Sequence, residues 1–221
     1  MRRVLEPEIM DDESQAVAYA RADFSSSNQA FVDGLIEDYG SRLRNVLDIG
    51  CGPADVPIRL ARAIPSVRIT AADASDAMAQ LARKAVDDAG LQQRMRIVKA
   101  RIPGLRLEDE RYDAVISKDL LHHLPDPAVF WQEIKTLAKD ETVVYVMDLF
   151  RPPTKEAANK IVESVAPDES PMLKRDFYNS LLAAFTLDEI REQLDDAGLR
   201  LTAAKVSERH VLAKGLVKNA R

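Results

Sequence analysis

Asn45-Val-Leu-Asp-Ile-Gly-Cys-Gly-Pro-Ala-Asp55 joins an apolar run to two closely spaced glycines. The run is typical of a buried parallel strand, and Gly50 and Gly52 end it where a helix can begin. Glycine permits backbone conformations that a side chain forbids and lets a ligand approach the main chain closely. The segment therefore predicts a strand, a tight turn and a helix, with a ligand at the turn.

Two acids in this segment argue against a nicotinamide dinucleotide site. Asp48 lies inside the strand, two residues before the first glycine, where an acid suits a cationic or hydrogen-donating group better than a pyrophosphate. Asp55 stands where the Gly-x-Gly-x-x-Gly pattern requires Gly or Ala. An NAD-dependent oxidoreductase is therefore disfavoured.

A second strand, Val67-Arg-Ile-Thr-Ala-Ala-Asp73, also ends in an acid, and Ser75 follows as a helix cap. A carboxylate at this strand end can bind both hydroxyls of a ribose that lies across the sheet edge. The two acids, Asp48 and Asp73, together predict a nucleoside ligand that carries an amine.

Three segments resemble the class I S-adenosylmethionine-dependent methyltransferases, particularly those akin to the ubiquinone and menaquinone methyltransferases. They are Val46-Leu-Asp-Ile-Gly-Cys-Gly-Pro-Ala, Asp73-Ala-Ser-Asp-Ala-Met78 and Tyr112-Asp-Ala-Val-Ile-Ser-Lys-Asp-Leu-Leu-His-His-Leu-Pro-Asp-Pro127. The resemblance implies S-adenosylmethionine as cofactor and methyl transfer to a small-molecule acceptor by in-line displacement. It also implies that Gly50 and Gly52 approach the cofactor through the backbone, that Asp48 serves its amine and that Asp73 binds its ribose.

The expected cofactor-binding residues are Asp48, Gly50, Gly52, Asp73, Ala74, Arg101, Ile102 and Lys118. Arg101 departs from the family, which usually has an Asp there that accepts from the adenine amino group. Arginine has no acceptor, so its contact must be stacking, donation to a ring nitrogen or recognition through the backbone of Arg101 and Ile102. A carboxylate on the substrate or on a modified cofactor is the remaining alternative.

The segment after the strand 112–118 should line the pocket beside the reactive methyl group, because ligands in doubly wound folds lie beyond the carboxyl ends of the strands. His122 or His123 is the candidate general base, since imidazole titrates near neutrality. The alternative is a hydrogen-bonded packing role. Asp119 is a candidate substrate-binding residue, and no metal site is predicted because the three histidines lack a suitable spacing.

The helix and strand patterns predict a single α/β domain over residues 1–221, Rossmann-like and doubly wound. Its seven-stranded sheet is mostly parallel, with an antiparallel last strand. The expected parts are an N-terminal helical lid (1–40), a cofactor-binding core (41–150), a helical cap inserted after the fifth strand (151–184), and a last helix with terminal strands (185–221).

The insertion 151–184 is expected to roof the pocket. Arg151, Lys174 and Tyr178 are its candidate substrate-binding residues, and they favour an anionic acceptor because arginine suits bidentate anion binding. A solvated charged helix face is the alternative interpretation of the same residues.

The composition of the chain argues for or against several other classes of function. The formal net charge of −5 argues against an RNA-modifying methyltransferase, which would need a basic surface, although a local patch stays open. A non-catalytic S-adenosylmethionine-binding protein is a further alternative. No long apolar span and no signal region are present, so a cytoplasmic protein without membrane contact is expected, and a homodimer is left open.

Overall fold

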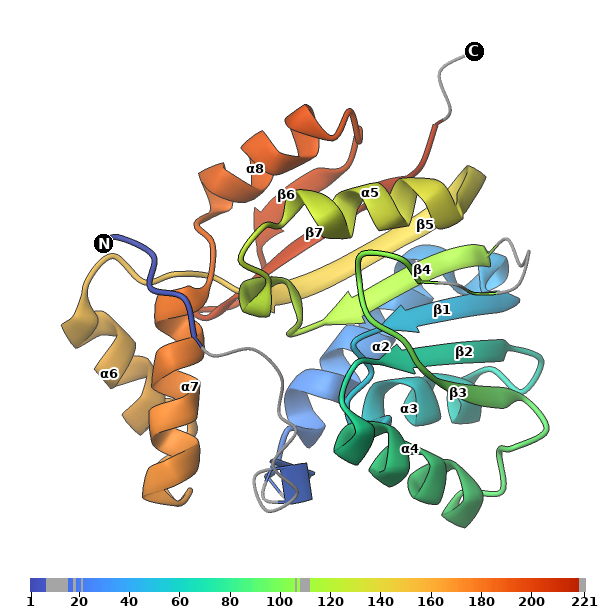
Figure 1. Cartoon of the computed structure of the whole chain (residues 1–221), viewed down its shortest axis with the longest axis horizontal. Helices are drawn as coiled ribbons and strands as arrows, with labels where there is room; N and C mark the ends of the chain where they lie inside the picture. Colours follow the sequence, from blue (N-terminus) through green and yellow to red (C-terminus); the bar gives the residue numbers. More distant parts are fainter. Residues whose placement is uncertain (7–15, 18, 21, 106, 108–111, 219–221) are drawn as a thin grey trace.

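The computed structural model describes residues 1–6, 16–17, 19–20, 22–105, 107 and 112–218 (Figure 1). Seven strands form one sheet in the order β3-β2-β1-β4-β5-β7-β6. Their bounds are β1 (Asn45–Ile49), β2 (Arg68–Asp73), β3 (Met95–Lys99), β4 (Tyr112–Lys118), β5 (Ala138–Leu149), β6 (Thr202–Lys205) and β7 (His210–Leu216). The pairs from β3 to β5 are parallel, whereas β7 runs antiparallel to both β5 and β6. This confirms the predicted mostly parallel sheet with a reversed last strand.

Helices connect the strands and cover both faces of the sheet. They are α2 (Ser25–Tyr39), α3 (Asp55–Ala63), α4 (Asp76–Asp88), α5 (Ala128–Leu137), α6 (Lys155–Val165), α7 (Pro171–Ala183) and α8 (Leu187–Asp196), with short turns η1 (Gly40–Arg42) and η2 (Leu121–His123). The sequence pattern also favours a helix at residues 14–22 within the expected N-terminal lid, and this segment lies partly outside the described residues.

Two apolar clusters hold these layers together. One packs α2, α3 and α4 on the sheet around Phe31, Leu35 and Tyr145. The other packs α5 and α8 on the opposite face around Phe130 and Trp131. Each strand of the sheet centre is buried from both sides, as expected for the near-continuous apolar runs of parallel strands.

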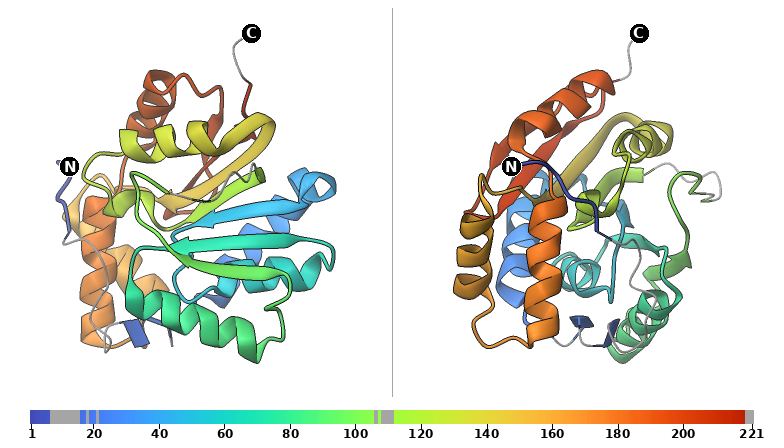
Figure 2. Two further views of the ribbon diagram at one scale, coloured as in Figure 1. Left: turned by 45° about the vertical axis from the view of Figure 1, so that its right-hand side comes forward. Right: turned by 60° about the vertical axis from the view of Figure 1, so that its left-hand side comes forward.

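The helices α6 and α7 pack on each other through a third, smaller cluster that includes Leu149 and Leu181. Figure 2 shows the pair side by side, beyond the carboxyl ends of the strands. The insertion after the fifth strand therefore folds as the predicted helical pair. Among the described residues, no helix combines the length and apolar character that crossing a membrane requires.

Candidate functional site

The turn after β1 brings two glycines against neighbouring strands. The backbone N–H groups of Gly50 and Cys51 both donate to the carbonyl oxygen of Ala72 on β2, at 2.8 and 3.1 Å. Gly50 has a φ of +77°, and a Cβ there would lie 2.9 Å from Leu120 Cδ2. Only glycine therefore lets the turn pack against the segment that follows β4.

Gly52 has a φ of +52°, and a Cβ at this residue would meet nothing within 4 Å. Its N–H donates to Asp73 Oδ2 at 2.8 Å, and the N–H of Ser75 donates to Asp73 Oδ1 at 2.9 Å. Burial raises the pKa of the Asp73 carboxyl despite these backbone hydrogen bonds. The ends of β1 and β2 thus fix one carboxylate beside an open space.

Asp48 is 2% exposed and lies in the central strand β1, next to its carboxyl end. Burial, and secondly the negative charge of Asp73, raise the pKa of Asp48 to about 8. A buried acid in this state is stabilised as a carboxylate only when a cation or a hydrogen-bond donor comes near. The carboxyl group is suited to an amine.

These residues share one cavity of about 800 Å³ at the carboxyl ends of the strands. Most of the residues predicted for the site line it. They are Asp48, Gly50, Gly52, Asp73, Ala74, Arg101, Ile102, Lys118, Asp119 and His123. The structure therefore brings these ten residues together around one cavity.

Lys118 and Asp119 form an ion pair at the end of β4, and the side chains are only 6% and 19% exposed. Asp119 also lies 3.7 Å from His210 Nε2 on β7. Burial would raise the pKa of Asp119, but Lys118 and His210 outweigh it and hold that pKa at about 2. Both charges of the pair are therefore largely compensated within the protein.

His122 does not line the cavity. It is 3% exposed, and its Nδ1 lies 2.7 Å from Asp148 Oδ1 at the end of β5. Burial alone would lower the pKa of His122, but the Asp148 carboxylate outweighs burial and raises it. Asp148 also accepts from the backbone N–H of Leu121 at 2.6 Å, so the pair holds η2 in place.

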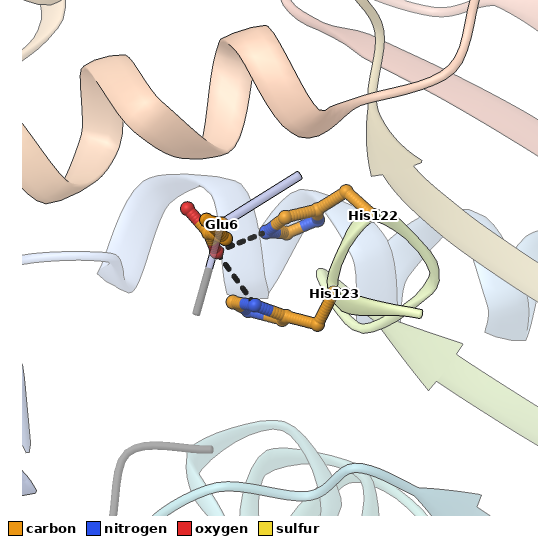
Figure 3. A group of neighbouring side chains, drawn as sticks. All are labelled: Glu6, His122 and His123. Carbon is orange, nitrogen blue, oxygen red and sulfur yellow. Dashed lines mark ion pairs between the residues drawn. The ribbon is translucent and has the colours of Figure 1, made fainter. Parts of the chain in front are cut away.

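His123 is the histidine at the cavity wall, and its side chain is 30% exposed. Its Nδ1 lies 2.6 Å from Glu6 Oε1, and His122 Nε2 lies 3.9 Å from the same oxygen (Figure 3). The three ligand atoms of Glu6, His122 and His123 lie within 4.8 Å of one another. Histidine spacing along the sequence could not reveal this trio, because Glu6 is distant in the chain.

The predicted substrate-binding residues of the insertion are not among the described residues that line the cavity. Arg151 is 7% exposed and donates to the carbonyl oxygen of Ala184 and to Glu189 on α8, at 2.9 and 2.6 Å. Lys174 pairs with Glu163 across α6 and α7 at 3.1 Å. Tyr178 packs against the apolar cluster of these two helices. The structure therefore places these three residues in contacts within the protein.

Other cavity residues were not predicted as site residues. Asn28 on α2 donates to Asp55 Oδ2 at 2.8 Å, and Arg59 donates to the same oxygen at 2.8 Å. All three line the cavity, as does Tyr19. For Asn28 and Tyr19 the only sequence signal was the position of the N-terminal helices before the first strand, which also fits simple packing. Asp55 and Arg59 lie on α3, after the glycine turn.

This arrangement can hold an amine-bearing nucleoside at the ends of β1 and β2, with an imidazole nearby. Asp48 offers a carboxyl group for a cation, Asp73 offers acceptors for hydroxyl groups, and Gly52 leaves room at the backbone. His123 is positioned to exchange a proton with a molecule in the same cavity.

Known proteins with similar sequences and folds agree with this geometry. A family model described as "Methyltransferase domain" matches residues 46–141. The ubiquinone biosynthesis O-methyltransferase of Pasteurella multocida is 29% identical over 116 residues, 49% of this chain and 47% of that protein. The chain thus spans about half the length of this curated relative.

Solved structures share the fold over nearly the whole chain. A SAM-dependent methyltransferase from Aquifex aeolicus has a TM-score of 0.71 at 19% identity, covering 93% of this chain and 98% of that one. The plantazolicin methyltransferase BpumL, solved with SAH, has a TM-score of 0.74 at 14% identity, covering 94% and 91%. Residues 46–141 therefore match a methyltransferase domain, and the chain shares the fold of S-adenosylmethionine-dependent methyltransferases over nearly its whole length.

Proposed function

We propose that this protein transfers a methyl group from S-adenosylmethionine to a small-molecule acceptor, and that His123 accepts the proton that the acceptor loses. The observation that carries the proposal is that Asp48, Gly52, Asp73 and His123 line the same cavity. Three of these residues offer what the donor needs, and the fourth offers a base.

The residues present fit the donor. A Cβ at Gly52 would meet nothing within 4 Å, so the backbone is free to meet a ligand there. The Asp73 carboxylate is oriented by two backbone N–H groups, and each oxygen keeps a lone pair for a ribose hydroxyl. The amine of the methionyl part would favour the charged form of Asp48, whose burial otherwise disfavours it.

Bound S-adenosylmethionine supplies the methyl group as a sulfonium, from which the carbon leaves as the acceptor's electron pair forms the new bond. The chain's own residues align the reactants and exclude water. His123 then takes the acceptor's proton, and its place on the cavity wall suits this role. His122, buried and paired with Asp148, serves to hold η2.

Arg151 and Lys174, the residues that suggested an anionic acceptor, give no support for a particular charge on the acceptor. Arg151 and Lys174 are engaged with Glu189 and Glu163, which supports the solvated or structural interpretation of the insertion's charges. The screen for acceptors should therefore include neutral phenols and amines beside carboxylates. Methylated product from any of them would separate an enzyme from a non-catalytic binding protein.

Calorimetric titration with S-adenosylmethionine, S-adenosylhomocysteine and NAD tests the cofactor. Asp73→Ala should weaken binding of both adenosyl ligands by about 1–3 kcal/mol, the usual cost of leaving polar partners unpaired. Asp113→Ala is the matched control, because Asp113 accepts from Asn45 and Lys139 at a distance from the cavity. No binding of either adenosyl ligand to the wild type, or equal binding to NAD, would contradict the proposal.

A further inference from the structure

The N-terminal segment, residues 1–6, lies across the loop that carries His123, and we call it the strap. Arg3 donates to the carbonyl oxygens of His122, Leu124 and Ala183 at 2.9, 2.8 and 2.5 Å. Its guanidinium also lies 3.8 Å from the ring centroid of Phe185. The strap is thus fixed on one side to the end of α7 and on the other to η2.

This anchoring delivers Glu6 to the two histidines. The Glu6 side chain is 10% exposed, and Ser180 on α7 donates to its carboxylate at 3.1 Å. Burial would raise the pKa of Glu6, but His123 and His122 outweigh burial and lower it. The group is therefore a buried carboxylate that faces imidazole rings.

The two histidines differ in their nearest carboxylate, although Glu6 lies within 4 Å of both. His122 Nδ1 lies 2.7 Å from Asp148 Oδ1. Figure 3 shows His123 Nδ1 facing Glu6. Only His123 of these two lines the cavity. Its Nδ1 is buried from solvent and lies 2.6 Å from Glu6 Oε1, but the two groups are not aligned as a hydrogen bond in this structure. The exposed 30% of the side chain belongs to the remaining atoms.

We propose that Glu6 is a positioning residue for His123, so that the strap completes the active site from outside the methyltransferase core. The Glu6 carboxylate keeps the proton of neutral His123 on Nδ1 and leaves Nε2 as the base. The acceptor's O–H or N–H proton passes to Nε2, and its electron pair forms the bond to the methyl carbon. The C–S electron pair stays on sulfur, and Glu6 balances the charge of the imidazolium that results.

The inference rests on the proposed function of His123, but its first test needs no acceptor. Nitrogen-15 NMR of labelled histidine reports which ring nitrogen carries the proton, and the chain has three histidines to assign. At about pH 8, above the ordinary range of histidine titration, His123 should carry its proton on Nδ1, both free and with S-adenosylhomocysteine. A wild-type His123 protonated on Nε2 would overturn the proposal, whether or not any variant folds.

Substitutions make the test specific. Glu6→Leu should release His123 to a mixture of tautomers while His122, held by Asp148, keeps its state. Glu6→Gln should restore part of the preference, because its amide oxygen can still accept. Glu163→Leu is the matched control, since Glu163 pairs with Lys174 on the exposed side of α6. An unchanged His123 signal in Glu6→Leu would overturn the role of Glu6.

Turnover of an acceptor found in the methylation screen gives a second readout. Glu6→Leu should lower kcat about 10- to 100-fold, less than the roughly 10²- to 10⁴-fold contributed by an acid–base group itself, with unchanged affinity for S-adenosylhomocysteine. When His123 is already replaced by Ala, adding Glu6→Leu should not lower kcat any further. Equal losses in both backgrounds would overturn the proposal.

The same three side chains are metal-ligand types, so manganese(II) chloride is the competing probe. Stoichiometric Mn²⁺ that broadens the signals of both His122 and His123 would overturn a proton-holding role in favour of a metal site. If S-adenosylhomocysteine does not bind, the proposed function fails. If it binds but Glu6→Leu changes nothing, only the inference about the strap fails.

Discussion

Asp48 is a carboxyl group at a position where the fold itself opposes its charge. It lies within β1 between β2 and β4, and its side chain is almost fully buried. The charge that acts on it is that of another carboxylate, Asp73. Removing such an acid from water disfavours its charged form, and the neighbouring charge adds to this effect. Asp48 therefore lowers the stability of the protein without ligand when it is ionised. A bound ligand with a positive charge would compensate the carboxylate and explains its presence best.

Asp48→Asn tests this cost through the pH dependence of unfolding. The pKa of Asp48 is raised from 3.8 to about 8 on folding, so the unfolded chain gives up this proton at a lower pH than the folded protein. The stability that the proton provides is complete below pH 3.8 and is lost as pH rises towards 8. Compared with Asp48→Asn, the wild type should therefore lose free energy of unfolding between about pH 4 and 8.

Urea denaturation of both proteins at several pH values, without ligand, measures this difference. The gap between the two curves should become constant above about pH 8, where Asp48 is ionised in both states. Curves that stay parallel from pH 4 to pH 8 would contradict the raised pKa. The variant should also bind S-adenosylmethionine less tightly, since it cannot become an anion.

At the level of elements, the sequence was sufficient to predict a helix start where a capping side chain binds a free backbone N–H of the first turn. The sequence predicts helix caps at Ser75, Thr154 and Thr186, the last in a capping box with Glu189. Each side-chain oxygen accepts from a backbone N–H three residues on. Thr186 and Glu189 form the predicted capping box, with both hydrogen bonds present. These contacts join neighbours in the chain, so the sequence alone contains them.

Strand ends were predicted less well, because they depend on partners elsewhere. The apolar pattern predicts the last but one strand over residues 199–206, but the strand begins at Thr202. The N–H groups of Leu199 and Leu201 donate to the carbonyls of Leu194 and Leu199 and not to a strand. The apolar pattern predicts the fifth strand over residues 142–149, but the strand begins at Ala138. The Thr142 hydroxyl accepts from Lys139 N and donates to Tyr112 O. The polar residues before Thr142 gave no sign of this pairing.

Arg151 connects the end of β5 to the start of α8 and provides a prediction at this scale. Its guanidinium binds Glu189, which also caps that helix, and the carbonyl of Ala184. Arg151→Ala should lower the free energy of unfolding by about 1–3 kcal/mol. Lys174→Ala removes an exposed pair and should cost about 0–1 kcal/mol.

Thermal or urea denaturation of the two variants checks this prediction, together with the Michaelis constant for an acceptor. We expect that constant to stay unchanged in both, because neither side chain lines the cavity. A raised Michaelis constant for a carboxylate acceptor, with normal stability, would instead restore the anion-binding hypothesis for the insertion.

On the scale of the whole molecule, the site depends on contacts between distant parts of the chain. The glycine turn, Asp48 and Asp73 could be predicted because each marks the end of a strand, and parallel strands end at one edge. Glu6 could not, since no periodicity or motif connects it to the loop after β4. The strap reaches that loop through Arg3, which binds backbone carbonyls, and through Glu6, which contacts the two histidines. Such contacts leave no pattern in the sequence.

Arg3 is the residue on which this long-range connection depends most. It joins the strap to η2 and to the end of α7 through four carbonyl oxygens, counting a weaker contact of 3.3 Å to Pro125, and it stacks on Phe185. Arg3→Ala should reduce the free energy of unfolding by about 1.5–3 kcal/mol, the range for hydrogen bonds to a charged group.

Arg3→Lys separates charge from geometry in this contact. Lysine keeps the positive charge but lacks the planar fork that reaches several carbonyls at once, so it should recover only part of the loss. Urea denaturation of the three proteins, with Arg2→Ala as the control at an adjacent exposed position, measures the difference. If Arg3→Ala unfolds like the wild type, the strap is held by contacts other than this guanidinium. If Arg3→Lys restores full stability, charge alone is sufficient and the fork is not needed.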